Sequence, residues 1–306
     1  MNSNSNVVIF GRGSIGVRHA KNLKKLNLNP IFLRLQKKRK IPNDDLDVPE
    51  IYSVSEALKF NPIGAVISTP TIFHCDHALE FLKENIPVYI EKPLGYKISK
   101  ENFDELEKYS KTAIIHGGFN LKYSPQINEF KENFFKEKKN IKKIEITWHT
   151  NIADWHPWED FRESYAFRND LGGGVIHTCS HEINLLLDFF PNAELIKNEN
   201  FFFKNVCTRC KAVYTEDLTE IYLDLDFMNK KSKQEILVTL NNNKFLKFDS
   251  DKYLQKNIQD VSCNESIKDF INCIRKKSIP KSNYEDSKKT YLYCEKLLNE
   301  KNYRRM

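Results

Sequence analysis

The sequence lacks the features that mark membrane-spanning, secreted and low-complexity proteins. No apolar run approaches the ~18 residues that a membrane-spanning helix requires. The opening residues MNSNSN have neither the basic segment nor the apolar stretch of a secretion signal, and no internal repeat or low-complexity linker is evident. We therefore expect a globular cytoplasmic protein with no membrane partner, and 306 residues allow about two domains with substantial cores.

Cysteines are scattered, which argues against a disulfide framework and a metal centre. The seven cysteines form an odd set, and without a secretion signal we expect reduced thiols. Cys207 and Cys210 have the C-x-x-C spacing, but neither a second cysteine pair nor a histidine cluster follows. Zinc or redox chemistry is the alternative at this spacing. We predict that the chain binds no metal.

A strong excess of one charge sign is also missing. The net charge is +7, from 48 basic and 41 acidic residues, and the basic runs at 37–40 and 136–143 include or adjoin polar and acidic residues. This mixing is typical of a solvated lysine-rich surface, whereas a nucleic-acid site needs a basic stripe with interleaved aromatic residues. We expect no nucleic-acid partner.

A glycine-rich loop follows the first apolar run of the chain, VVIF at 7–10. Gly11 permits a tight turn, Gly13 lets the backbone approach a phosphate, and Gly16 lets the next helix pack closely on its strand. The start of that helix offers N–H groups and a positive dipole end to an anion. A plain glycine turn is the alternative. The predicted pyrophosphate site comprises Gly11, Arg12, Gly13, Ser14, Ile15 and Gly16.

The first part of the chain alternates apolar runs with helical patterns, which predicts a doubly wound parallel α/β sheet. Ligands gather at the carboxyl ends of such strands, so Thr69, Pro70 and His74 are expected to line the nucleotide site. The further strands are expected at 30–35, 65–68, 87–90 and 113–116, and the helices at 15–26, 55–60, 74–85 and 100–110.

A second domain of the α+β type is expected from the pattern after Gly117. A helix at 125–136 leads to an alternating, half-buried strand at 143–149, and several β-type runs between 201 and 248 predict a mostly antiparallel sheet. We assign 1–118 to a dinucleotide-binding Rossmann domain. We assign 119–306 to substrate binding and oligomerisation, with helices within 266–300 able to pack back on the first domain.

Cofactor preference is indicated by a missing acidic residue. About 20 residues beyond the glycine loop, where an Asp or Glu would hold the adenosine ribose of NAD, the chain is basic and polar. A phosphate suits this loop better than two hydroxyls, so we predict NADP in preference to NAD, with Arg34 as the 2′-phosphate contact. A solvated lysine-rich turn is the alternative. The loop contains Arg34, Gln36, Lys37, Lys38 and Arg39.

The peptide YIEKPLG at 89–95 ends the fourth predicted strand, at the edge where a nicotinamide would lie. Lys92 is suited to donate a hydrogen bond or a proton to a carbonyl or alkoxide oxygen as hydride moves. Glu91, which precedes it, and Lys92 are also expected to bind the cofactor. An ordinary surface lysine is the alternative. Pro93 fits a cis peptide that would aim the lysine inward.

Four segments together resemble the Gfo/Idh/MocA family, the relatives of glucose-fructose oxidoreductase and inositol dehydrogenase. The resemblance implies that Lys92 is the catalytic lysine and that His181 is the family's histidine, and it implies a dimer or tetramer. His177 stands where the family most often has Asp, which departs from the usual proton relay. The segments are GRGSIG at 11–16, STPTIFH at 68–74, EKPLG at 91–95 and LGGGVIHTCSHEIN at 171–184.

If residues 175–190 are helical, His177, His181 and Asn184 share one polar face. Histidines at i and i+4 also suit a metal, but a third ligand is not evident, and a structural role at a domain junction is a further alternative. Proton transfer or substrate hydrogen bonding is favoured. The opposite, apolar face comprises Ile176, Cys179, Ile183 and Leu187.

The segment at 147–174 is dense in aromatic and basic residues. Aromatic faces stack on sugar rings, and arginines pair bidentately with a carboxylate or phosphate. Packing against its own domain or a subunit partner is the alternative. It is also similar to a branch of the family found with sialic-acid-type and surface-sugar pathways. The candidate substrate residues are Lys92, Asn120, Trp155, Trp158, Arg162, Tyr165, Arg168, His177 and His181.

We therefore predict an NAD(P)-dependent oxidoreductase that acts on a hydroxyl or ketone of a sugar, a sugar acid or a nucleotide-linked sugar. Lys92 would stabilise charge on the substrate oxygen, His181 would exchange the proton, and His177 would assist or orient the substrate. A non-catalytic NAD(P)-binding sensor or regulatory protein of the same fold is the alternative.

Overall fold

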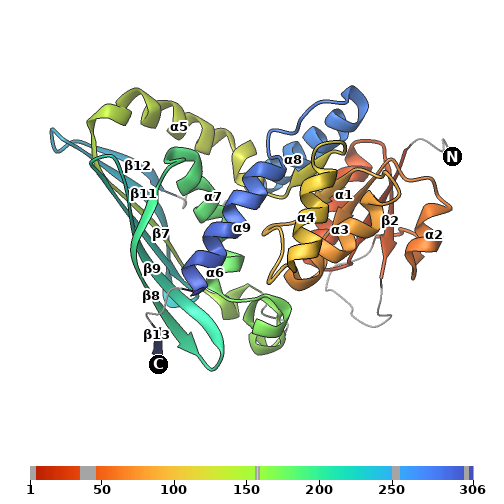
Figure 1. Ribbon diagram of the computed structural model, residues 1–306, viewed down its shortest axis with the longest axis horizontal. Helices are drawn as coiled ribbons and strands as arrows, with labels where there is room; N and C mark the ends of the chain where they lie inside the picture. The colour runs from red at the N-terminus through yellow and green to blue at the C-terminus, as the bar shows by residue number, and fades with distance from the viewer. Residues whose placement is uncertain are drawn as a thin grey trace. The chain divides into compact units, whose positions relative to one another are not determined.

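The computed structural model describes residues 5–34, 46–155, 157, 159–249, 256–299 and 303–305. Lys37 and Trp158, which were predicted to contact cofactor and substrate, lie outside these residues. The chain divides into two compact units, shown in Figure 1. The first unit comprises Met1–Phe119 and Cys263–Lys288, and the second comprises Asn120–Ser262 and Lys289–Met306.

The first unit contains a six-stranded sheet in the order β3-β2-β1-β4-β5-β6, and all its strand pairs are parallel. This confirms the predicted doubly wound sheet. The strand order reverses between β1 and β4, where ligands of such sheets bind. The strands are β1 (Asn6–Phe10), β2 (Asn29–Leu33), β3 (Glu50–Ile51), β4 (Gly64–Ile67), β5 (Val88–Ile90) and β6 (Ile115–Gly117).

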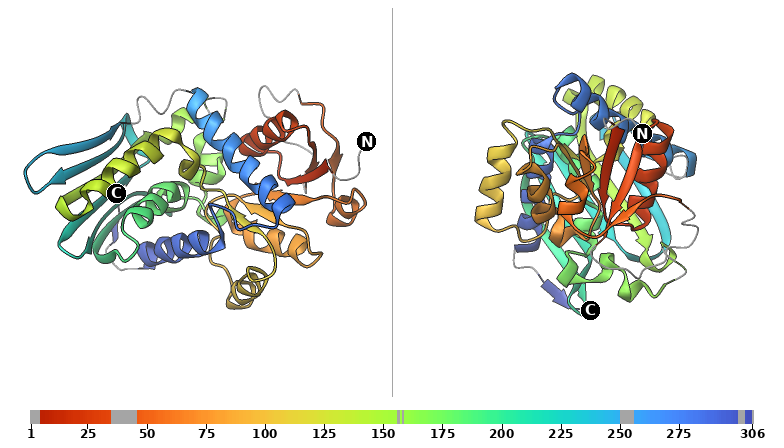
Figure 2. Two further views of the ribbon diagram at one scale, coloured as in Figure 1. Left: turned by 90° about the horizontal axis from the view of Figure 1, so that it is seen from above. Right: turned by 90° about the vertical axis from the view of Figure 1, so that its right-hand side faces the viewer.

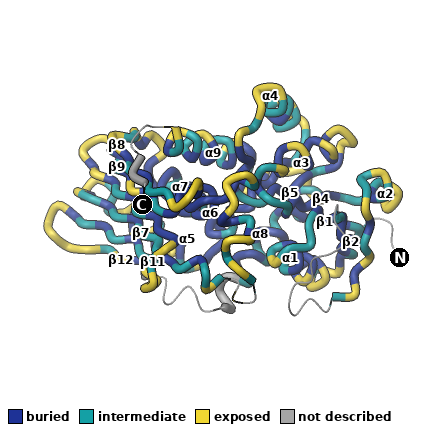
Figure 3. The backbone as a smooth tube through the Cα atoms, turned by 90° about the horizontal axis from the view of Figure 1, so that it is seen from below, coloured by how far each residue is buried: buried dark blue, intermediate teal, exposed yellow. Residues whose placement is uncertain are grey.

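Helices accompany this sheet, so its central strands are apolar along their whole length. Figure 3 shows the strands β1, β4 and β5 as buried. The helices are α1 (Ser14–Lys25), α2 (Val54–Leu58), η2 (Thr71–Phe73), α3 (His74–Leu82), α4 (Lys100–Tyr109) and α8 (Lys256–Lys276), of which the part from Cys263 onward belongs to this unit.

Helix α8 joins the first unit from far along the chain. Its residues Ile267, Phe270 and Ile271 are buried in one core with strand β1 and helix α1, and Figure 2 shows α8 in blue beside α1 in red. Gly64 leaves room for this helix, because a Cβ there would lie 2.9 Å from Cδ1 of Ile274 and 3.0 Å from Cζ of Phe270.

The second unit contains a seven-stranded sheet in the order β12-β11-β7-β10-β9-β8-β13. It is mixed and mostly antiparallel, as predicted, with parallel pairing of β10 with β7 and of β13 with β8. The strands are β7 (Ile141–Asn151), β8 (Glu194–Phe203), β9 (Val206–Glu216), β10 (Thr219–Asp226), β11 (Met228–Leu240), β12 (Phe245–Asp249) and β13 (Tyr303–Arg305).

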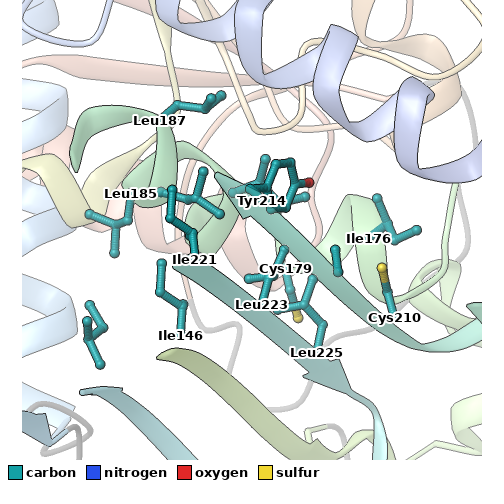
Figure 4. Packing of buried hydrophobic residues seen from close by; sticks show 14 of the residues in the cluster. Ile146, Ile176, Cys179, Leu185, Leu187, Cys210, Tyr214, Ile221, Leu223 and Leu225 are labelled. Carbon is teal, nitrogen blue, oxygen red and sulfur yellow. The ribbon is translucent and has the colours of Figure 1, made fainter. Parts of the chain in front are cut away.

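Helices lie on one face of the second sheet (Figure 1). Inward residues of the strands, such as Ile146, Ile221 and Leu223, pack there against residues of α6 and α7 such as Ile176 and Leu185 (Figure 4). The helices are η3 (Asn120–Tyr123), α5 (Pro125–Glu137), η4 (Lys138–Asn140), α6 (Val175–Thr178), α7 (Ser180–Phe189) and α9 (Tyr284–Asn299).

All seven cysteines are buried, and none forms a disulfide bond. Burial raises the pKa of Cys207 to about 12 and also raises that of Cys210, which disfavours the thiolate that zinc or redox chemistry needs. Within the part of the chain that the structure describes, His, Cys, Asp and Glu side chains form no group that could hold a metal ion. In the same residues, no helix is long and apolar enough to cross a membrane.

The other face of the second sheet carries ion pairs. Asp224 lies 3.2 Å from Nε2 of His149, and it accepts bonds from Nε and Nη2 of Arg209 at 3.1 and 2.8 Å. Burial raises the pKa of Asp224, but the bonds from His149 and Arg209 outweigh burial and lower it to about 2. The charged carboxylate is therefore favoured in the folded state.

A lowered carboxyl pKa stabilises the fold above the ordinary value of 3.8, and this contribution is lost as the pH falls toward about 2. We expect Asp224→Asn to lower the free energy of unfolding at pH 7 by about 1 kcal/mol, discounted for exposure, and by much less near pH 2. Urea unfolding at several pH values measures this. Asp217→Asn, in an exposed turn, is the control, and a pH-independent loss in Asp224→Asn would contradict the assignment.

Candidate active site

Two glycines of the loop between β1 and α1 are required by the packing of the protein itself. Gly11 has φ +111°, and a Cβ there would lie 2.7 Å from the carbonyl oxygen of Ser68. A Cβ at Gly16 would lie 2.3 Å from the carbonyl oxygen of Gly11. These contacts hold the start of α1 against the carboxyl ends of β1 and β4.

Gly13 differs, because among the described residues no atom outside its own neighbours in the chain lies within 4 Å of the position of its Cβ. It is the N-cap of α1 without a side-chain hydrogen bond, and the first turn, which includes Ser14 and Ile15, contains no acidic residue. The main-chain N–H groups of the first turn lie at a positive helix end that no acidic residue of the first turn neutralises. A side chain here would fill room that a phosphate needs, so the loop fits a dinucleotide pyrophosphate.

A carboxylate joins the two arginines at the edge of the nucleotide site. Nη1 of Arg12 and Nη1 of Arg34 each lie 2.8 Å from Oε1 of Glu50. The guanidinium of Arg12 also lies 4.7 Å from the ring centroid of Phe32. Burial raises the pKa of Glu50, but the hydrogen bonds from Arg34 and Arg12 outweigh burial and lower it.

Glu50 was not among the predicted site residues. It is the first residue of the two-residue strand β3, and no local pattern distinguishes it from a surface glutamate. Its carboxylate cancels one of the two positive charges beside β2. The side chain of Arg12 is thereby held against Glu50, although its backbone is part of the glycine loop.

The loop after β4 is braced by two histidines. Ring nitrogens of the buried His74 lie 2.8 Å from the carbonyl oxygens of Thr69 and Pro93. The hydroxyl of Thr69 lies 3.1 Å from Nδ1 of His77. Thr69 and Pro70 are half-buried. His74 therefore connects the loop after β4 to the EKP segment through their main-chain carbonyls.

The EKP segment directly follows β5. The Lys92–Pro93 peptide bond is cis, and Lys92 is half-buried. Both carboxylate oxygens of Glu91 bond within the chain: Oε1 lies 2.7 Å from Nε2 of His19, and Oε2 accepts from the main-chain N–H of Lys92 at 3.3 Å. Neither His19 nor this use of Glu91 was expected from the sequence.

In the second unit the helix expected over 175–190 is broken, which corrects the prediction. Helix α6 ends at Thr178, Cys179 has φ −94° and ψ 31°, and α7 begins at Ser180. The hydroxyl of Thr178 donates to the carbonyl of Gly174 at 2.9 Å, and such back-bonding bends helices. His177 and His181 therefore lie on either side of a bend.

The polar residues of α6 and α7 differ in burial, and two of them contact α9. His177 is buried, with Nδ1 3.3 Å from the carbonyl oxygen of Gly173 and Nε2 3.6 Å from Oε1 of Glu295 on α9. Asn184 is also buried and donates to Thr290 of α9 at 3.0 Å. His181 is half-buried. Glu295 was missed because no sequence pattern links α9 to position 177.

The aromatic segment forms a series of short 3₁₀ turns that pack partly on their own unit. Trp155 donates to Thr150 at 2.9 Å and meets Phe227 edge-on at a centroid distance of 5.3 Å. Tyr165 packs on the core, and Asn120 is half-buried at the start of η3. The turns are η5 (Ile152–Asp154), η6 (Phe161–Glu163), η7 (Tyr165–Phe167) and η8 (Asn169–Leu171).

The two arginines of this segment are exposed and already paired. Nε of Arg162 lies 2.9 Å from Oδ1 of Asp160, and Nε of Arg168 lies 3.2 Å from Oδ1 of Asp170. An anionic substrate group would have to compete with these carboxylates.

The fold and the glycine loop define a nucleotide-binding Rossmann domain. Residues 5–116 match the model of the Gfo/Idh/MocA family, described as an oxidoreductase family with an NAD-binding Rossmann fold. This match confirms the resemblance that the sequence motifs indicated. The matched residues include nearly all of the first unit's six-stranded sheet.

Known proteins similar to the chain include named dehydrogenases. It is 27% identical over 183 residues to glucose-6-phosphate 3-dehydrogenase of Bacillus subtilis, an alignment that covers 58% of this chain and 49% of that protein. The chain thus aligns with about half the length of this relative.

Solved structures share the fold. Myo-inositol 2-dehydrogenase from Lactobacillus plantarum superposes with a TM-score of 0.79 at 16% identity, covering 98% of this chain and 97% of that one. GenD2 from gentamicin A biosynthesis, in complex with NAD, gives a TM-score of 0.78 at 14% identity, covering 95% and 92%.

Gly16 and Gly13 of the loop are expected to respond differently to an added methyl group. Gly16→Ala should lower the free energy of unfolding by about 1–3 kcal/mol, because its Cβ meets main chain. Gly13→Ala should change stability less than Gly16→Ala and weaken NAD(P)H binding about tenfold, or about 1.4 kcal/mol, because its Cβ meets no described atom of the chain and would meet the proposed pyrophosphate. Thermal unfolding and fluorescence titration measure the two effects. Unchanged NAD(P)H affinity in Gly13→Ala would contradict this placement of the pyrophosphate.

Proposed function

We propose that the protein is an NAD(P)-dependent oxidoreductase that transfers hydride to or from a sugar, a sugar acid or a nucleotide-linked sugar. The observation that carries this proposal is the open cradle at Gly13, which follows β1, together with the EKP segment, which follows β5 of the same sheet. Two similar proteins named as dehydrogenases of glucose 6-phosphate and myo-inositol support a polyol or sugar substrate. The bound nicotinamide would supply the hydride chemistry.

Lys92 is proposed as the catalytic residue that binds the reacting oxygen. Its ammonium would donate a hydrogen bond to the substrate hydroxyl or carbonyl and stabilise negative charge on that oxygen. The support is its place directly after β5, half-buried, with its main-chain N–H held by Glu91. This role needs no metal ion.

The proton is proposed to pass through His181, and His177 is proposed to orient the substrate or its neighbours. His177 has a carbonyl oxygen and a carboxylate near its two ring nitrogens, which favours an orienting role over direct proton exchange. Substrate recognition is proposed for Asn120, Trp155, Trp158, Arg162, Tyr165 and Arg168.

Further proposals concern the setting of the enzyme. Residues 1–118 would bind the dinucleotide, and 119–306 would bind substrate and form a dimer or tetramer. A cytoplasmic role in the biosynthesis of surface glycans is consistent with the sugar-pathway resemblance of the 147–174 segment. The sensor alternative predicts nucleotide binding without turnover of any sugar.

NADP is proposed as the preferred cofactor, with Arg34 binding the 2′-phosphate and Lys37 nearby. The phosphate would replace Glu50 as the partner of one guanidinium, since both arginines now share one carboxylate oxygen. Arg12 would keep its contacts with Leu46 and Phe32 during this exchange.

Removing the competing carboxylate tests this cofactor preference. We expect Glu50→Gln to tighten NADPH binding about tenfold with little change for NADH, and Arg34→Ala to weaken NADPH binding by a similar factor. Titration of both reduced cofactors measures this, with Glu84→Gln at an exposed site as the control. Tighter binding of NADH than NADPH to the unaltered protein would refute the preference.

Replacing the proposed catalytic lysine tests the activity. We expect Lys92→Ala to lower kcat on the best substrate of a panel of hexoses, hexose phosphates, inositols and nucleotide-linked sugars by about 10²–10⁴-fold. The dissociation constant of the cofactor should stay within about threefold. Lys100→Ala, on exposed α4, is the control. Full activity in Lys92→Ala would refute the mechanism, and no turnover of any sugar by the unaltered protein would favour a sensor.

A further inference from the structure

A buried hydrogen bond connects the phosphate-binding helix to the EKP segment. His19 lies in the second turn of α1 and is fully buried, and its Nε2 lies 2.7 Å from Oε1 of Glu91. A carboxylate oxygen accepts, so Nε2 carries the proton and donates. The ring of Tyr89 packs on His19 at a centroid distance of 5.0 Å.

The carboxylate of Glu91 is charged although it is enclosed. Burial raises its pKa, but the hydrogen bond and charge of His19 and the charge of Lys92 outweigh burial, so the pKa is lowered. Its second oxygen accepts from the main-chain N–H of Lys92 at 3.3 Å. One carboxylate thus joins α1 to the backbone of Lys92.

Glu91 has little room to leave this position. The N–H of Gly118 donates to the carbonyl of Ile90 at 2.7 Å, which brings the end of β6 against the EKP segment. A Cβ at Gly118 would lie 2.9 Å from Cα of Glu91 and 3.1 Å from its Oε2. The absence of a side chain at Gly118 lets the carboxylate lie between β6 and α1.

We propose that the His19–Glu91 bond is a positioning device that couples occupation of the pyrophosphate cradle to the placement of Lys92. His19 belongs to α1, which would contact the cofactor, and Glu91 belongs to the EKP segment, which would contact the substrate oxygen. The proposal therefore rests on the proposed function. It makes Glu91 and His19 positioning residues, whereas the sequence suggested that Glu91 binds the cofactor directly. Anion binding restricts the motion of the start of α1. The His19–Glu91 hydrogen bond extends this restriction to the main chain of Lys92.

ADP-ribose separates this coupling from direct contact, because it carries the pyrophosphate and lacks the nicotinamide. In the unaltered protein, we expect ADP-ribose to slow amide hydrogen exchange both at 11–20 and at 89–95. In His19→Leu, protection at 11–20 should remain and protection at 89–95 should disappear, with ADP-ribose affinity within about threefold. His19→Gln, which keeps a donor near the position of Nε2, should restore the protection.

Steady-state kinetics give the second readout. His19→Leu should lower kcat about tenfold to a hundredfold through misplacement of Lys92, with the KM for the cofactor almost unchanged, and His19→Gln should recover much of the loss. Asn22→Leu is the matched control, because Asn22 is a buried polar residue on the same helix. Its exchange pattern and kcat should stay near those of the unaltered protein.

Two results would overturn the coupling. One is unchanged protection at 89–95 in a folded His19→Leu variant, and the other is an equal loss of ADP-ribose affinity and kcat, which would indicate damage to α1 alone. If His19→Leu does not fold, Glu91→Gln gives the same comparison at nearly constant volume. Because hydrogen exchange needs no turnover, failure to find a sugar substrate would refute the proposed function without deciding the coupling.

Discussion

The close approach of α1 to the ends of β1 and β4 is the contact on which the first unit's site depends. It exists because Gly16 and Gly11 have no Cβ to meet the main chain of Gly11 and Ser68. The hydroxyl of Ser68 completes it by donating to the carbonyl oxygens of Phe10 and Gly11, each at 3.1 Å. With α1 held there, its first N–H groups and its second-turn histidine occupy definite positions relative to the strand ends.

The sequence predicted the parts of this arrangement that depend on local pattern. The glycine spacing and the alternation of strands with helices identified the parallel sheet, since each requires only neighbouring residues. The roles of Glu50, His19 and Glu295 could not be predicted, because their partners are distant in sequence. The break at Cys179 was missed because i and i+4 spacing assumes an unbent helix, whereas Thr178 bonds back to its own helix start.

Charge counting along the chain also overstated how basic the cofactor edge is. Arg34 was counted as a free cation, but the structure pairs it and Arg12 with one carboxylate, and that carboxylate comes from β3. A charge-assisted bond that is partly buried is worth about 1.5–3 kcal/mol, similar to the gain expected from a new phosphate contact. Under the proposed function, cofactor discrimination would therefore depend on an exchange of partners and not on the net number of basic residues.

The EKP segment is connected by hydrogen bonds to two elements that precede it in the sequence. His74 bridges the carbonyls of Pro93 and of Thr69 in the loop after β4, and His19 reaches Glu91 from α1. Both use buried groups whose loss would leave a polar atom without its partner, which costs more than the net worth of the bond. A substitution in α1 or in the loop after β4 should thus affect the position of the EKP segment, although neither element adjoins that segment in the sequence.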